Sequence, residues 1–490
     1  MNKLSLTHIG ERVFLLTALF KMFSCTPITN IQIQAENIIY VSPDGTGDGS
    51  SIDNPIELQV ALSSPNIVPG SILCLLDGVY TGEYNVDIHG SEGLTITIKS
   101  LNAYQAIIDG AFNIGNGDGI RGSYCIVKNI HFTNLDAFRG TWASPQGTIS
   151  IPIQVYVLAP HVSVINNYIH DGGLGIGGYD AAHTLVVYGN LCWNNGWADD
   201  MQGGAQNIYT HGNNQLIKCN VFAGAFKTTF VAFSTTSYIT NYTAQDNIIF
   251  NRGVAIVGSM AMRMENINII SNHILNKCLA IGYVFDQDDD VIVEDNIVYT
   301  PEDENGALNV LYFEKVRYQR NKLIGIRTWF KDPADTALKD WNVDNNEYHE
   351  VGDFPNYELD NFVSWQGWQA AGNDLNSTFD HQMPSANQVF VYPNEYKDDD
   401  DSRIGIVVIW NWEGLNTVAV DLTTLGLTIG ETYRWRQAQD PLVDVDTWVD
   451  DGNPYTFAMT GHTVAKPIGF DEELIPTQFP TFGCFIIELV

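Results

Sequence analysis

The chain is poor in charged residues, and among these it is poorest in basic ones. Of its 490 residues 17% are charged, and 24 Lys and Arg stand against 57 Asp and Glu, which gives a formal net charge of −33. Proteins that bind nucleic acid neutralise phosphates with Lys and Arg, so this balance argues against a nucleic-acid partner. An acidic ligand would need local basic groups or a bound cation to offset the negative field of the chain.

Long apolar runs are lacking beyond the N-terminus, so we expect no membrane span. Residues 1–25 start weakly basic and then carry an apolar core from Val13 to Phe20, which is too short to cross a bilayer. This pattern is typical of a secretory signal peptide, and Cys25 offers a lipoprotein-type cleavage point as the alternative. The sequence therefore predicts a secreted or cell-surface protein, with an outer-membrane lipoprotein as one form.

Paired cysteine spacings of the kind that bind metals are also absent. The seven cysteines are scattered along the chain: Cys25, Cys74, Cys125, Cys192, Cys219, Cys278 and Cys484. In a chain of this length we interpret them as small buried apolar side chains rather than as a disulfide framework.

The sequence does contain a repeated motif, in which a run of β-branched residues ends in Asn and is followed by alternating apolar and polar residues. The marker asparagines are Asn167, Asn190, Asn220, Asn247, Asn272, Asn296, Asn321 and Asn346. Their spacing of 23 to 30 residues, with short strands between them, predicts a β-solenoid rather than a sandwich.

The choice of Asn has a physical reason at a sharp turn between two strands. Asn tolerates the left-handed backbone conformation that such a turn needs, and we expect the marker residues to adopt it. Its amide can also hydrogen-bond to the next Asn when coils stack about 4.8 Å apart. The repeat thus predicts architecture and carries no information on chemistry.

These motifs resemble those of the right-handed parallel β-helix proteins, the group that includes pectate lyase-like and other polysaccharide-active enzymes. The resemblance covers roughly Ile39 to Asn346 and implies a parallel β-helix over residues 36–349 with an N-terminal helical cap. Residues 350–386 are predicted to bridge to a small antiparallel β-sandwich over 387–490, because alternating strands resume from Gln388. The predicted fold class is all-β.

The resemblance also indicates where a substrate would bind. In the resembled enzymes the groove lies on the outward face of the strands that precede each Asn-ending strand. Alternation there places Ile208 and Thr210 inward, and Tyr209 and His211 outward.

Counting back nine residues from the marker asparagines gives a row that mixes an imidazole, a guanidinium and a carboxylate or amide. The row comprises His211, Tyr238, Arg263, Gln287 or Asp286, and Tyr312. A purely structural face more often shows Thr, Ser and Val. We therefore expect this row to lie near the chemistry.

Two basic residues, Arg252 and Lys277, are one coil apart and should lie side by side at a strand-to-loop corner. Together they can bind a uronate carboxylate. Alternatively, a Lys whose pKa is lowered by a neighbouring cation can abstract the proton α to that carboxylate. The competing interpretation is that both pair with acidic side chains on the surface.

Acidic runs supply the candidate metal ligands and acid–base pairs. Asp199 and Asp200 can act as acid and base in glycoside cleavage or as oxygen ligands for Ca²⁺. Asp286 and Asp288 belong to the denser run and are the predicted Ca²⁺ ligands, with a solvated turn as the alternative. The run Lys397–Asp401 is expected to be a solvated hairpin loop or a weak Ca²⁺ contact.

The preferred hypothesis from the sequence is a polysaccharide lyase acting on a uronate-containing glycan. Its predicted catalytic residues are His211, Arg263, Lys277, Arg252 and Tyr209. Its predicted substrate-binding residues are Tyr179, Trp197, Asp199, Asp200, Tyr283 and Tyr312. The alternatives are a glycoside hydrolase that uses Asp199 and Asp200, and a non-catalytic glycan-binding or adhesion protein.

Overall fold

A computed structural model describes most of the chain. The described residues are 37–137, 153–197, 205–260, 262–283, 288–301, 306–325, 328–331, 339–349, 365–398, 401–443 and 445–490. The predicted signal peptide lies outside them, as do Asp199, Asp200, Asp286 and the segment 350–364. The architecture below belongs to the compact unit Ile38–Val490.

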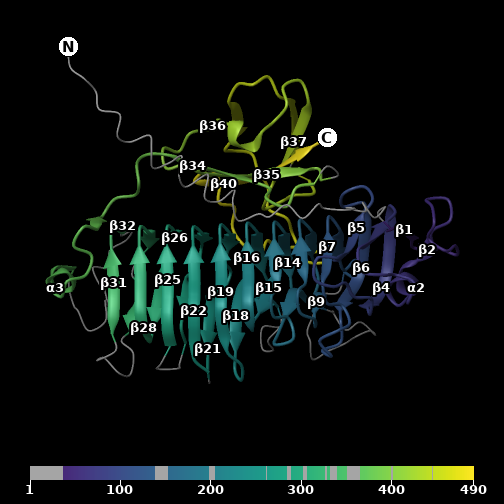
Figure 1. Ribbon diagram of the computed structural model, residues 1–490. Coiled ribbons are helices and arrows are strands. Elements are labelled where there is room, and N and C mark those ends of the chain that lie inside the picture. Colours follow the sequence, from purple (N-terminus) through teal and green to yellow (C-terminus); the bar gives the residue numbers. More distant parts are fainter. Residues whose placement is uncertain are drawn as a thin grey trace, which may run out of the picture. The chain divides into compact units, whose positions relative to one another are not determined.

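The described chain is nearly all β, and its larger part is a parallel β-solenoid, as predicted (Figure 1). Between Cys125 and Lys331 each coil contributes three strands, and we name the three resulting faces in chain order. The first face is a sheet of β2 (Ile56–Glu57), β1 (Asn37–Ser42), β3 (Ser71–Leu75), β5 (Ile96–Ser100), β7 (Cys125–Lys128), β10 (Ser163–Ile165), β13 (Val186–Tyr188), β16 (Asn213–Lys218), β19 (Ile239–Gln245), β22 (Met264–Ile270), β25 (Asp288–Glu294), β28 (Phe313–Gln319) and β31 (Asp340–Asp344).

The second and third faces follow the turn after each first-face strand. The second face comprises β8 (His131–Thr133), β11 (Tyr168–His170), β14 (Leu191–Asn195), β17 (Val221–Ala225), β20 (Ile248–Phe250), β23 (His273–Leu275), β26 (Ile297–Thr300), β29 (Lys322–Gly325), β32 (Glu347–His349) and β33 (Thr378–Asp380). The third face comprises β9 (Ile153–Val157), β12 (Leu174–Gly178), β15 (Ile208–Thr210), β18 (Phe230–Ser234), β21 (Ala255–Ser259), β24 (Leu279–Ile281), β27 (Leu308–Leu311) and β30 (Phe330–Lys331). The long strands β4 (Gly78–Val86) and β6 (Ala106–Ile114) pair with each other at the start of this sheet.

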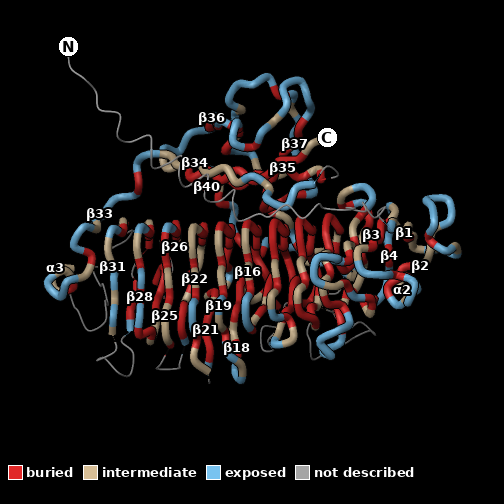
Figure 2. Tube along the Cα trace, viewed as in Figure 1, coloured by how far each residue is buried: buried red, intermediate tan, exposed pale blue. Residues whose placement is uncertain are grey.

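Inward side chains stack from coil to coil and fill the solenoid with a continuous apolar core. Buried residues recur along the coils of the solenoid in Figure 2. One such row on the first face runs in register through Val127, Val164, Val187, Ile217, Ala244, Ile269, Val293, Tyr318 and Val343. Full burial of a Val or Ile side chain stabilises the fold by about 1.5–3 kcal/mol, so the row holds adjacent coils together.

The marker asparagines form the predicted ladder without a break from Asn167 to Asn346. At each step the side-chain oxygen of one Asn accepts two bonds from the preceding one, as when Asn272 Oδ1 accepts Asn247 N–H and Nδ2–H at 3.0 Å each. The same pair of bonds recurs along the row. Each marker Asn is buried, so the ladder satisfies backbone groups that water does not reach.

The marker asparagines do not adopt the left-handed conformation that we expected, and it occurs one residue earlier in each coil. The residue before each marker has the positive φ: 54° at Asn166, 55° at Asp246 and 55° at Ser271, for example. Residues as different as Cys219 and Arg320 occupy equivalent positions. The marker Asn is therefore required for its amide, which bonds to the next coil, and its neighbour makes the turn.

Short helices lie at the two ends of the solenoid. At the N-terminal end α2 (Leu58–Leu62) buries Leu58 and Leu62, and Glu57 caps it by accepting from two backbone N–H groups. After the last coil, α3 (Trp365–Ala370) buries Trp368, whose Nε1 donates to Asp374. Asp374 also accepts from Nδ2 of the last marker, Asn346, so it closes the ladder. Within the described residues, no helix is both long and apolar enough to cross a membrane.

The C-terminal part forms antiparallel sheets, as predicted. One sheet orders β34 (Gln388–Pro393), β35 (Arg403–Trp410), β40 (Phe482–Leu489), β37 (Thr432–Gln437) and β38 (Val445–Val449), and a second pairs β36 (Thr417–Val420) with β39 (Tyr455–Ala458). A short 3₁₀ turn, η2 (Thr423–Leu425), follows β36. Buried residues of both sheets form one cluster, which is the core of a small sandwich.

The other side of the five-stranded sheet packs on the second face of the solenoid. Tyr168, Leu191, Val221, Ile248 and Leu275 share a buried cluster with Ile406, Val408, Trp410, Phe482 and Ile486. This contact covers the outward side of the second face. The first and third faces remain as places where a large ligand could bind.

Lys397, Asp398 and Asp401 lie in the hairpin loop between β34 and β35, as predicted, but Asp401 is buried rather than solvated. Asp398 and Asp401 lie 2.6 and 3.1 Å from Nζ of Lys128, which is 5% exposed, and Asp401 is itself 3% exposed. These residues therefore bind the sandwich to the first face. The cysteines among the described residues are buried, as expected.

Asn247→Ala tests the ladder. The substitution removes the acceptor of Asn220 and the donor to the Ile217 carbonyl, so we expect a loss of about 2–4 kcal/mol in the free energy of unfolding. Urea unfolding measures it. Asn268→Ala is the control, because Asn268 lies outside the ladder and its side chain makes bonds of 3.3 and 3.5 Å; equal losses in the two variants would contradict the role of the ladder.

Candidate functional site

Four aromatic side chains from three consecutive coils meet on the outward side of the third face. Tyr179 packs against Tyr156 and Tyr209 with ring centroids 5.5 Å apart in each pair, and stacks on His211 at 5.1 Å and 19°. Tyr156 lies in β9, Tyr179 directly after β12, and Tyr209 and His211 at the end of β15. We call Tyr156, Tyr179, Tyr209 and His211 the aromatic cluster.

The predicted alternation in β15 is confirmed. Ile208 and Thr210 are fully buried, whereas Tyr209 and His211 are partly exposed. Tyr209 and Tyr156 lie opposite Gly177 on the two strands that flank it, so the coil of Gly177 separates them. Because Gly177 has no side chain, the rings of the neighbouring coils can approach across it.

His211 has a carboxylate at one ring nitrogen. Its Nδ1 lies 3.0 Å from Oδ1 of Asp180, a close polar contact that is not aligned as a hydrogen bond in this conformation. Ser237 donates to the other oxygen of Asp180 at 2.6 Å and so holds the carboxylate in place. Burial lowers the pKa of His211, and Asp180 opposes this shift only in part. At neutral pH the imidazole is therefore neutral and available as a base.

The pKa values of the tyrosines in the cluster shift in the opposite direction. Burial raises the pKa of Tyr156, Tyr179 and Tyr209 above the ordinary value, so their hydroxyl groups keep their protons. A protonated phenol donates hydrogen bonds and can act as an acid. The cluster thus places a neutral base next to a proton donor.

Aromatic surface continues along the third face beyond the cluster. Phe233 contacts Tyr283 edge to face at 5.1 Å, and Tyr283 crosses over Gly258, where an added Cβ would lie 2.9 Å from the Cβ of Tyr283. Tyr312 follows β27 and has Nζ of Lys331 at 5.7 Å from its ring. The predicted substrate-binding tyrosines, Tyr179, Tyr283 and Tyr312, therefore all lie at the ends of third-face strands.

Arg263 lies at the same end of the third-face strands as His211, but two coils further along. Two strand spacings amount to about 10 Å. Its Nη2 bonds to Glu314 at 2.9 Å and lies 3.1 Å from Asp289, so its charge is already shared between two carboxylates. Arg263 is thus near the cluster without being part of it.

Arg252 and Lys277 lie one coil apart, as their spacing predicts. They are at the opposite end of the third-face strands from His211. They precede β21 and β24, whereas His211 follows β15. Nη1 of Arg252 donates to the Phe226 carbonyl at 2.8 Å, and Asn251 donates to the Lys277 carbonyl at 3.0 Å. The structure therefore separates the predicted catalytic residues into two groups, one at each end of the strands.

Trp197, two residues after β14, is 3% exposed, so its indole packs inside the protein. Asp199 and Asp200, which follow it, lie outside the described residues. The roles predicted for these three residues remain predictions.

Asp288 points into the solenoid rather than toward solvent. It is fully buried opposite Phe313, one oxygen accepts the Met264 N–H at 2.9 Å, and the other has no hydrogen-bond partner. Burial raises its pKa to about 7. Ca²⁺ needs six to eight oxygen ligands, and the described part of the chain has no group of three His, Cys, Asp or Glu placed to hold a metal. The other predicted ligand, Asp286, lies outside the described residues, so the calcium site stays a prediction.

Asp180 and Ser237 are the residues of this site that sequence reasoning missed. They are 57 positions apart and meet only because the coils stack in register. The one signal for Asp180 is its place directly after Tyr179 at the end of a groove strand.

No family model matches this sequence, and the search of curated proteins found no match. Solved structures with a similar fold include a mannuronic acid specific polysaccharide family 6 lyase from human gut microbiota, 14% identical over 71% of this chain and 91% of that chain, with a TM-score of 0.43. Another is the catalytic unit of a thermostable GH87 alpha-1,3-glucanase from Streptomyces thermodiastaticus strain HF3-3, at 14% identity, 64% and 60% coverage, and a TM-score of 0.44. A third is the pectate lyase Pel9A, at 12% identity, 68% and 80% coverage, and a TM-score of 0.34. The activities in these names belong to those proteins.

The protonation of His211 can be measured by NMR with labelled histidine. We expect its pKa below the ordinary 6.5, because burial disfavours the imidazolium. Asp180→Asn should lower the pKa further, since the carboxylate favours the charged form. A rise in the pKa of His211 in that variant would contradict this electrostatic description of the pair.

Asp288→Asn tests the buried carboxyl through the pH dependence of stability. The folded-state pKa of Asp288, about 7, is above the ordinary 3.8. The contribution of this carboxyl to the free energy of unfolding is therefore fully present below about pH 4 and is lost as the pH rises toward 7. The Asn variant should therefore be more stable than the native protein at pH 8, by roughly 2–4 kcal/mol, with the difference vanishing near pH 4.

The control for this experiment is the neighbouring Asp289→Asn. The hydrogen bond from Lys315 lowers the pKa of Asp289, as does the nearby Arg263, so its removal should destabilise the protein at pH 8. Changes of the same sign in both variants at pH 8 would show that burial does not set the behaviour of Asp288.

Proposed function

We propose that this protein is exported, acts on a polysaccharide, and cleaves a uronate-containing glycan by β-elimination. The observation that carries the proposal is the aromatic cluster, in which a neutral imidazole lies among tyrosines on an outward face of a long solenoid. This arrangement combines a surface for sugar rings with an acid and a base.

The tyrosines suit the binding of sugars because a pyranose presents an apolar face of C–H groups to an aromatic ring. Tyr156, Tyr179 and Tyr209 come from adjacent coils, whose strands are about 4.8 Å apart. Further along the same face, Tyr283 and Tyr312 extend the surface by several coils. An extended sugar chain can therefore contact one ring after another along the face.

In the elimination, His211 takes the proton from the carbon α to the uronate carboxylate through Nε2, while Nδ1 faces Asp180. The electron pair of that C–H bond forms a carbon–carbon double bond, and the bond from the next carbon to the glycosidic oxygen breaks. Tyr209 donates its proton to the leaving oxygen. The proton balance is restored when His211 releases a proton and Tyr209 regains one from solvent.

The basic residues are assigned to binding uronate carboxylates. Arg263 is about 10 Å along the solenoid from His211, so it would hold the carboxylate of a neighbouring sugar rather than that of the reacting one. Its two carboxylate partners, Asp289 and Glu314, would have to release it in part. Arg252 and Lys277 would bind at the opposite edge of the same face.

The direct test is incubation with a panel of uronate polymers and a neutral glucan, read by the ultraviolet absorbance of an unsaturated product. We expect absorbance with at least one uronate polymer and none with the glucan. His211→Ala should lower the rate by about 10²–10⁴-fold, which is the usual contribution of a positioned base. His183→Ala, a change at an exposed histidine after β12, should leave the rate unchanged.

Other outcomes would replace the proposal. New reducing ends without the absorbance would indicate hydrolysis, for which Asp199 and Asp200 are the candidates. Saturable binding of a glycan with neither signal would indicate the non-catalytic function. Full activity of Lys277→Ala would remove Lys277 from the mechanism.

A further inference from the structure

The segment between β39 and β40 crosses the edge where the second face of the solenoid meets the third. We call its residues 464–475 the strap, and they form no helix or strand. Near one end of the strap, Asn194 donates through Nδ2 to the Ala465 carbonyl at 3.1 Å. At the other end, Leu474 shares a buried cluster with Phe226. The position of the strap therefore depends on such contacts with the solenoid.

A buried carboxylate holds the middle of the strap. The Ile468 N–H donates to Oδ1 of Asp171 at 2.7 Å, and the side chain of Asp171 is 2% exposed. Oδ2 of Asp171 lies 2.6 Å from Nδ1 of His170, whose ring stacks on Trp193 with the centroids 4.1 Å apart. Asp171 therefore joins the strap to an imidazole of the solenoid.

A second imidazole continues this chain of polar contacts. Nε2 of His131, the first residue of β8, lies 2.6 Å from Nε2 of His170. When both rings are neutral, His131 donates to His170, and His170 donates through Nδ1 to Asp171. Every contact then joins one donor to one acceptor. We call Asp171, His170 and His131 the histidine row.

With the strap in place, the histidine row can hold one added proton but not two. With one, the charged ring still donates to the neutral ring across the 2.6 Å contact. With two, a pair of N–H groups would face each other and the hydrogen bond would be lost. Burial lowers the pKa of His131 well below its ordinary value, and His170 and Arg436 lower it further. Histidines in water each take up a proton below about pH 6.5, so an open row binds one proton more than the closed row.

Charged groups on the elements packed against His131 have partners of their own. Arg436 of β37 donates through Nε to Oε2 of Glu488 at 3.0 Å, and Tyr168 of β11 donates to Oε1 of Glu488 at 2.6 Å. On β6, which pairs with β8, the carboxylate is Asp109, and it accepts a backbone N–H at 2.9 Å. The charged side chains of the strap itself are exposed, and they belong to Lys466, Asp471, Glu472 and Glu473.

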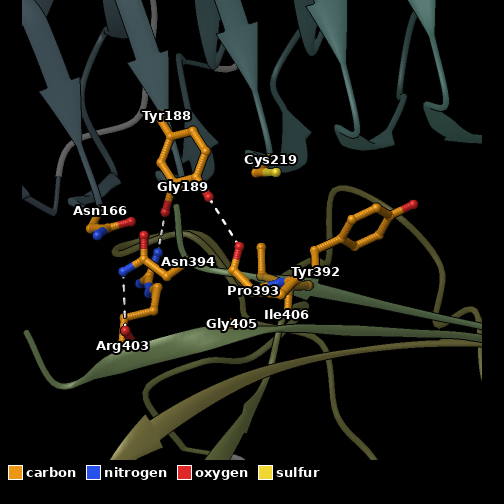
Figure 3. A pocket seen from close by; sticks show the side chains of 10 residues that line it. All are labelled: Asn166, Tyr188, Gly189, Cys219, Tyr392, Pro393, Asn394, Arg403, Gly405 and Ile406. Atoms are coloured by element: carbon orange, nitrogen blue, oxygen red, sulfur yellow. Dashed lines mark hydrogen bonds between the residues drawn. The ribbon is translucent and has the colours of Figure 1, made fainter. Parts of the chain in front are cut away.

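The body of the sandwich is held to the solenoid by contacts outside the histidine row (Figure 3). Arg403 of β35 donates through Nη1 to the Gly189 carbonyl. Tyr188 of the solenoid donates to the Pro393 carbonyl at 3.3 Å. Buried apolar side chains of β35 and β40 also pack on the second face. Because these contacts involve neither an imidazole nor a carboxylate, the strap can be released while the rest of the sandwich stays docked.

We propose that the histidine row is an acid-sensitive latch, which holds the strap on the solenoid near neutral pH and releases it in acid. When the Ile468 N–H leaves Asp171, water reaches the row, and each ring can take up a proton without facing another N–H group. Because the open form binds more protons than the closed form, acid shifts the equilibrium toward it. Leu474 packs beside Ala205 and Phe226, which precede β15 and β18, so release also alters the edge of the third face.

The first test is amide hydrogen exchange of the full chain at pH 7 and pH 5, corrected for the intrinsic exchange rate at each pH. One extra proton on a group with a pKa of about 6.5 raises the open population about 10- to 30-fold over this range. We expect the protection factor of the Ile468 amide to fall by that factor, and those of the β35 amides to stay unchanged. An unchanged protection factor at Ile468, or a parallel fall in β35, would overturn the proposal.

The variant His131→Gln tests the row itself. Its side-chain amide can donate to His170 or accept from it, so the row survives protonation of His170, and Ile468 should keep nearly the same protection at both pH values. His183→Gln, at an exposed histidine outside the row, should retain the full pH dependence. Retention of the full dependence in His131→Gln would contradict the latch. None of these measurements involves a glycan, so the latch and the proposed lyase activity can fail independently.

Discussion

Each coil of this protein depends on stacking in register on the next, and the buried asparagine ladder fixes that register. The amide oxygen of each marker Asn accepts from the backbone and the side chain of the preceding marker, from Asn190 through Asn346, and Asp374 accepts from Asn346 at the end of the row. A slip by one residue would turn inward side chains outward. Side chains on the third face therefore have fixed neighbours that are far apart in the sequence, as when Tyr209 lies opposite Gly177.

The three faces of the solenoid serve different purposes because the sandwich occupies one of them. Its five-stranded sheet buries the outward side of the second face, and Asp398 and Asp401 reach around to Lys128 on the first. The aromatic cluster lies on the third face, clear of this contact. The sandwich therefore packs on the solenoid through buried apolar side chains and ion pairs. The residues with acid–base chemistry lie on the third face, away from this contact.

The fold was largely predictable from the sequence, because a solenoid repeats one short pattern with a visible period. The same pattern gave the outward direction of Tyr209 and His211, which depends only on alternation along one strand. It did not reveal the residue that makes each turn, since positions such as Cys219 and Asp246 share a conformation but no chemical type. Nor did it reveal Asp180 beside His211, or Arg252 at the far end of the strands, because both depend on how many residues each loop contains.

Whether the aromatic cluster is the glycan site can be tested most directly by a crystal structure of the His211→Ala variant with a uronate oligosaccharide. We predict sugar rings along Tyr156, Tyr179 and Tyr209, with the α-carbon of one uronate next to the position of the missing imidazole. An oligosaccharide bound on the first face or on the sandwich, with the aromatic cluster unoccupied, would contradict it.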